Sequence, residues 1–236
     1  MPSARPLINA FVTAASVLAL AGCAPFVNPG PMASEQREVT AVTTVVLDTS
    51  GDLTIAEGEP SLVIHAPEAA LDRLTSEVRG DTLVLGRTPG PSLSLGSVRY
   101  ELTVPDLEAI EVNGSGSVDA RVSSRDSVRL EVDGSGEVDW SGIDAARLEV
   151  RISGSADIEL SGSASEADIE LDGSGDVDAD DLQARDAVVV LDGSGEIDVA
   201  VSDRLSASIS GSGRIGYSGD PTATKDVAGS GDIVRN

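Results

Sequence analysis

Hydrophobic and polar residues alternate along most of this chain, and the alternation recurs about every twenty residues. Each repeat is marked by a Gly-Ser-Gly-like turn, with aliphatic residues two positions before and four positions after its first glycine. Alternation with a period of two indicates β-strands, so each repeat is predicted to place strands on both sides of a turn. The first glycines are Gly114, Gly134, Gly154, Gly173, Gly193, Gly211 and Gly229.

A repeat of this size cannot bury its aliphatic side chains alone. Stacked repeats can, because each residue then lies about 4.8 Å from its equivalent in the next coil. The pattern therefore predicts an all-β fold, a parallel β-helix with coils of about 18–20 residues. Glycine adopts positive φ without a Cβ penalty, so we expect the glycines to turn the chain. The central serines are predicted to be structural.

Residues 45–55, VVLDTSGDLTI, match the same template, with Leu47 before the turn and Leu53 after it. We expect the β-helix to begin there. The 65 residues from Thr49 to Gly114 are enough for about three further coils. Within them, HAPEAALDRLTSEV has a short helical pattern after Pro67, which predicts an insertion or a cap. The segments DTLVLG and VRYELTV are predicted strands.

The N-terminus reads as an export signal. Residues 1–22 carry Arg5, then an uncharged apolar run too short for a transmembrane helix. Leu-Ala-Gly-Cys, ending at Cys23, resembles a bacterial lipobox, whose cysteine is acylated and becomes the mature N-terminus. We predict a signal peptide over 1–22, a lipidated tether over 23–38 and a β-helix domain over 39–236. The acyl chains, palmitate among them, would hold the protein on the exported side of the bacterial cell membrane.

Composition narrows the possible partners. The formal net charge is −24, which argues against nucleic acid, because displacing phosphate counterions needs lysine and arginine. Cys23 is the only cysteine, which excludes a disulfide framework and a thiolate zinc site. Aromatic residues make up only 2 %, so the core must be aliphatic. Trp140 and Tyr217 share the position six after the first glycine, and we expect them to cover one face or an end rather than bind a ligand.

Stacked carboxylates are the strongest chemical lead. We expect Asp176 and Asp178 to lie beside Glu196 and Asp198 in the next coil, where the four could bind Ca²⁺ or simply be solvated. Apart from this Ca²⁺ no cofactor is indicated. No G-x-S-x-G elbow is present, and His65 is the only histidine. We therefore predict no catalytic residues.

The opening VVLDTSGDLTI and the serial V-x-G-S-G-[DE]-[VI] units resemble the bacterial auto-transporter adhesin head GIN domain family, over roughly residues 40–236. The resemblance implies a right-handed parallel β-helix and an adhesin, and it carries no catalytic residues over to this chain. Our leading hypothesis is a surface-exposed, lipid-anchored module that binds an extracellular glycan or protein without catalysis. Two alternatives stay open. One is a carbohydrate-acting enzyme that uses surface carboxylates, and the other is an envelope structural protein that self-associates through its ends.

Overall fold

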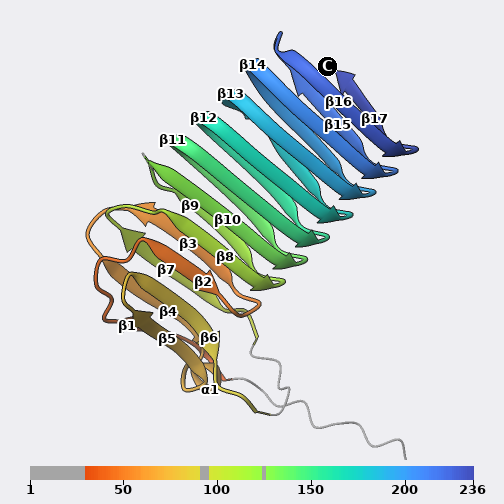
Figure 1. Ribbon diagram of the computed structural model, residues 1–236. Helices are drawn as coiled ribbons and strands as arrows, with labels where there is room; N and C mark the ends of the chain where they lie inside the picture. The colour runs from red at the N-terminus through yellow and green to blue at the C-terminus, as the bar shows by residue number, and fades with distance from the viewer. Residues whose placement is uncertain (1–29, 91–95, 124–125) are drawn as a thin grey trace, which may run out of the picture.

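The computed structural model describes residues 30–90, 96–123 and 126–236, which form one β-solenoid with a single short helix (Figure 1). The N-terminal part contains β1 (Met32–Arg37), β2 (Thr44–Leu47), β3 (Asp52–Glu57), β4 (Ser61–Pro67), α1 (Glu68–Leu71), β5 (Leu74–Arg79), β6 (Thr82–Arg87) and β7 (Arg99–Val104). The repeats contain β8 (Ala109–Gly114), β9 (Ser117–Arg121), β10 (Ser127–Gly134), β11 (Glu137–Gly154), β12 (Asp157–Gly173), β13 (Asp176–Gly193), β14 (Glu196–Gly211), β15 (Arg214–Ser218), β16 (Thr222–Gly229) and β17 (Asp232–Arg235).

The repeats stack as parallel coils, as the sequence predicts. Segments before the turn pair in register from coil to coil, for example Val132 with Ile152, and so do segments after it, for example Val138 with Ile158. We call the outer surface of the first set face A and that of the second set face B. Face A comprises residues 109–113, 127–133, 147–153, 166–172, 186–192, 204–210 and 222–228, and face B comprises residues 117–121, 137–141, 157–160, 176–179, 196–199, 214–218 and 232–235.

The turns between the two faces explain the glycines. All seven first glycines have positive φ, between 120° and 147°. The serine that follows donates its backbone N–H to the glycine carbonyl of the preceding coil, as Ser194 does to Gly173 at 2.9 Å. A Cβ at Gly193 would lie 1.9 Å from that same carbonyl oxygen, so the coils can approach to hydrogen-bonding distance only where no side chain intervenes.

The N-terminal coil does not lie where the sequence predicted. Residues 45–55 stack directly on the Gly114 repeat, with Val45 opposite Ile110 and Leu53 opposite Val118. The prediction of about three coils between these two units is therefore wrong. The intervening chain folds onto the other side of β2 and β3, where β6 and β7 pair with them in parallel. Backbone pairing between segments distant in sequence decides this order.

Antiparallel strands and the helix close the N-terminal end. β4 pairs antiparallel with both β1 and β7, and β5 pairs antiparallel with β6. α1 follows Pro67, whose fixed φ suits a helix start, and it buries Ala70 and Leu71. The predicted helical pattern is thus a cap, although Leu74 begins a strand. No helix among the described residues is long and apolar enough to cross a membrane.

The core consists of aliphatic columns that run the length of the solenoid. It also holds Trp140, which is 0 % exposed, so the expectation that this residue covers a face or an end is wrong. Trp140 lies opposite Ala120, and this small neighbour leaves room for the indole. Tyr217, at the equivalent position, is 7 % exposed and lies one coil from the C-terminal end.

Candidate functional site

A groove of about 450 Å³ crosses face A over β12, β13, β14 and β16. Its floor includes Ala167 and Ala187, which occupy the inward position that Leu148 and Leu205 fill in the coils on either side. Leu205 continues this floor in the next coil, so the floor consists of inward-facing residues and is apolar. The outward side chains on either side of it, such as Asp186 and Val188, form the walls of the groove.

Ion pairs fix the rim of the groove. Arg147 Nη2 lies 2.5 Å from Glu166 Oε2, and Arg204 Nη2 lies 2.8 Å from Asp186 Oδ2. The hydrogen bonds from Arg204, together with one from Arg185, hold the pKa of Asp186 below its usual range. The rim carboxylate stays ionised at neutral pH, so the rim presents charges of both signs.

The outer side of the groove starts at Asp168 and is neutral in the coils that follow. Val188 is 46 % exposed, and Ser206, Thr222 and Thr224 add hydroxyl groups along the following coils. A lone exposed valine is common on protein surfaces. Beside an apolar floor and a hydroxyl row, however, it belongs to a continuous surface that combines apolar contact with hydrogen bonding. Such a lining is typical of ligand-binding hollows.

Face A changes character along the solenoid axis. In the earlier coils Glu149 forms ion pairs with Arg129 at 3.1 Å and with Arg151 at 2.8 Å. Arg151 also forms an ion pair with Glu170. The hydrogen bond from Arg151 is the main cause that lowers the pKa of Glu149. This part of face A satisfies its charges internally. The groove adjoins this network. In the column of outward residues that contains Glu149, the next residue is Asp168 and the one after it is the neutral Val188.

The predicted carboxylate stack lies on face B. Asp176 is the register partner of Glu196, and Asp178 that of Asp198. Arg214, in the next coil, forms ion pairs with Glu196 and with Asp198, the latter at 3.6 Å. Among the described residues, no three acidic, histidine or cysteine side chains form a group able to hold a metal ion. The Ca²⁺ site at these four residues stays a prediction, and two of its ligands already face a guanidinium group.

One carboxylate beside this stack has a shifted pKa. Burial, together with the charges of Asp198, Asp178 and Asp181, raises the pKa of Asp180. A raised carboxyl pKa is what a general acid requires. Asp180 follows the face B segment of this coil, and it is the carboxylate beside the stack whose pKa is shifted in the direction that a general acid needs.

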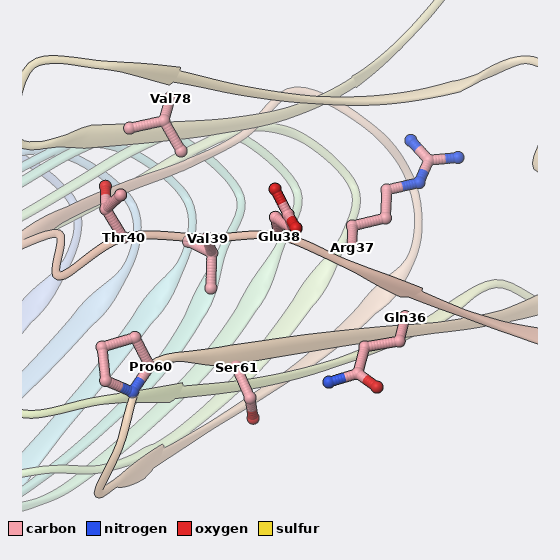
Figure 2. Close-up of a pocket in the computed structure, with 8 residues that line it drawn as sticks. All are labelled: Gln36, Arg37, Glu38, Val39, Thr40, Pro60, Ser61 and Val78. Atoms are coloured by element: carbon pink, nitrogen blue, oxygen red, sulfur yellow. The ribbon is translucent and has the colours of Figure 1, made fainter.

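A second hollow, of about 780 Å³, lies at the N-terminal end of the solenoid (Figure 2). The segment that carries Val39 runs between Val78 on one side and Pro60 and Ser61 on the other. Arg37 also lines it, and its guanidinium donates to the carbonyl oxygens of Leu71 and Leu74 at 3.0 and 2.8 Å. These bonds tie β1 to α1 and β5, so Arg37 stabilises the cap.

The single histidine lies in a row of polar side chains across β1, β4 and β7. His65 Nδ1 lies 2.7 Å from Ser34 Oγ, and its Nε2 lies 3.3 Å from Glu101 Oε1. This order resembles a catalytic triad, but Ser34 and Glu101 are exposed on the outer surface of an antiparallel sheet. Stabilising an oxyanion depends on preorganised donors in a water-excluded site. We interpret the row as cross-strand pairing that holds the cap together.

Residues 1–29 lie outside the described residues, and with them Cys23 and the predicted signal peptide. The model of the family "Putative auto-transporter adhesin, head GIN domain" matches residues 41–221. The chain belongs to this family. The match ends before the last coil and includes the groove except for Thr222 and Thr224 on β16. It supports a binding or adhesion role at the cell surface or outside the cell.

Three solved structures show the same fold. A protein from Bacteroides fragilis described as a "putative adhesin" has a TM-score of 0.83 at 23 % identity, covering 87 % of this chain and 97 % of its own. A "putative lipid binding protein" from Parabacteroides distasonis has a TM-score of 0.71 at 26 % identity, covering 88 % and 97 %. A "putative adhesin" from the same species has a TM-score of 0.73 at 19 % identity, covering 88 % and 98 %. No curated protein matches the chain.

Proposed function

We propose that this protein is a non-catalytic adhesion module, anchored by lipid at Cys23 on the exported side of the bacterial cell membrane, that binds an extracellular glycan or protein. The groove on face A is the observation that carries the proposal. It crosses several coils, so an extended partner could contact equivalent side chains in each coil. Its apolar floor and hydroxyl row suit the mixed apolar and polar surface of such a partner.

The groove can be tested by one charged substitution. Val188→Lys places an ammonium group beside Arg204 and over the apolar floor. We expect the variant to lose at least about tenfold in affinity for whichever partner the wild type captures on an array of extracellular glycans and proteins, since desolvating an added charge costs more than 1.4 kcal/mol. Because Val188 is exposed, the melting temperature should change little.

Val78→Lys is the matched control, since Val78 is also an exposed valine, at 39 %, but lines the N-terminal hollow. It should bind as the wild type does. Loss of binding in this variant alone would move the site to the N-terminal hollow and contradict the proposal. Release of sugar products by the wild type, abolished in Asp198→Asn, would instead support the carbohydrate-acting enzyme, for which the raised pKa of Asp180 is the supporting observation.

The anchor has its own test. Cys23→Ser removes the thiol that acylation requires, so we expect palmitate labelling of the protein in bacterial cells to fall to background. Wild-type levels of labelling in the variant would contradict lipidation at this residue.

A further inference from the structure

The coil formed by β16 and β17 carries charges at positions that are apolar in the preceding repeats. Lys225 is the register partner of Ala207 on face A, and Arg235 is that of Tyr217 on face B. The column of Lys225 contains Ile110, Leu130, Val150, Ile169, Val189 and Ala207 in the earlier coils. The column of Arg235 contains Ala120, Trp140, Leu160, Ala179, Val199 and Tyr217. Both columns of buried side chains thus end in a cation.

Both cations are held by contacts within the last two coils. Lys225 is the only lysine of the chain, and its Nζ lies 4.5 Å from the centroid of the Tyr217 ring. Its Nζ also donates to the carbonyl oxygen of Ile233 at 3.2 Å, which links β16 to β17. Arg235 Nη1 forms an ion pair with Asp220 at 3.0 Å. The inward direction of Lys225 is therefore fixed by specific contacts.

Without these charges the end would be a strong template for association. β16 and β17 are the outermost strands of their ladders, and edge strands with unpaired backbone groups readily accept another strand. Val227, also at an inward position, is 43 % exposed there. A further coil stacked on this end would enclose Lys225 and Arg235 in the apolar core. Burying a charge in this way is costly, so the two cations oppose stacking of another coil on β16 and β17.

The opposite end uses a different solution. There the antiparallel strands β1 and β5 and the helix α1 cover the columns of buried side chains, and α1 contributes the buried residues Ala70 and Leu71. Inward charge is therefore needed only at the C-terminal coil. Inward-pointing charged residues are a recognised way of blocking strand addition at an exposed edge.

We propose that Lys225 and Arg235 protect the C-terminal coil against docking of a second copy of this chain. Two such ends have the same strand lengths and the same apolar columns, so a two-fold axis across the solenoid would place β16 against β16 and β17 against β17. The inward cations of both copies would then be buried together, and their repulsion prevents the contact. The end-to-end form of the structural-protein hypothesis is thereby disfavoured.

The test replaces both cations by apolar side chains of similar length, in Lys225→Met with Arg235→Met. We expect the wild type to sediment as a monomer in detergent buffer, and the full-length double variant to at least double in mass by sedimentation velocity in the same buffer. The matched control is Arg129→Met with Arg151→Met, which makes the same chemical change at outward positions of face A. This control should keep the wild-type mass.

A second variant separates charge from shape. Lys225→Glu with Arg235→Glu keeps charge at both inward positions while removing the contact with the Tyr217 ring, so we expect it to remain a monomer. Association of this variant would mean that the cation–ring contact, and not inward charge, blocks docking, and would overturn the proposal. Folded, monomeric Met/Met protein with a wild-type circular dichroism spectrum would overturn it too, and so would wild-type protein already associated through this end.

Discussion

Gly193→Ala is expected to unfold a large part of the solenoid. Gly193 has φ of 143°, and a Cβ there would lie 1.9 Å from the carbonyl oxygen of Gly173, the acceptor for the next coil's backbone. Relief requires the two coils to separate, which breaks parallel pairing on both faces. We expect the free energy of unfolding to fall by more than about 4 kcal/mol, a loss seen only when a specific structural requirement is violated. Urea denaturation followed by circular dichroism measures it.

Gly114→Ala is the matched control for this prediction. Gly114 occupies the same repeat position with φ of 120°, but a Cβ there would meet nothing within 4 Å, because the turn of the neighbouring coil is Thr49-Ser50-Gly51. The control therefore carries only the backbone strain, about 1–3 kcal/mol. Equal losses in the two variants would show that positive φ alone, and not the close approach of the coils, requires glycine.

Trp140→Ala is expected to lower the free energy of unfolding by the second-largest amount, after Gly193→Ala. The indole is fully buried between Ala120 and Leu160, and its Nε1 donates to the carbonyl oxygen of Val122 at 3.4 Å. Truncating a buried tryptophan costs about 3–5 kcal/mol, through lost apolar burial and the cavity left behind. That is a large fraction of the 5–15 kcal/mol typical of a whole domain. The same denaturation experiment would show the loss.

Two further variants bracket this result. Trp140→Phe keeps a ring in the same space and should lose clearly less stability than the alanine variant. Val188→Ala truncates a side chain that is 46 % exposed and should change stability by no more than about 0.5 kcal/mol. A Trp140→Ala protein as stable as Val188→Ala would contradict the assignment of Trp140 to the core.

The two inward cations of the last coil, Lys225 and Arg235, could have been found from the sequence. The columns two before and four after the first glycine predicted the coils, because both are aliphatic in every repeat. The columns four before and six after it would also have revealed Lys225 and Arg235, since every earlier repeat is apolar there. The same alignment places Ala167 and Ala187 between leucines, although only the structure shows that a groove passes over them on face A.

The sequence by itself determined the all-β class, the coil length and the need for glycine at each turn, because these depend on period-two alternation and on local φ. The tertiary structure decided the order of the first coils, where residues 45–55 lie between β6–β7 and β8–β9. It also decided that Trp140 is buried and that Arg214 lies beside Glu196 and Asp198. These features arise from pairing and packing between distant segments, which no local pattern of residues specifies.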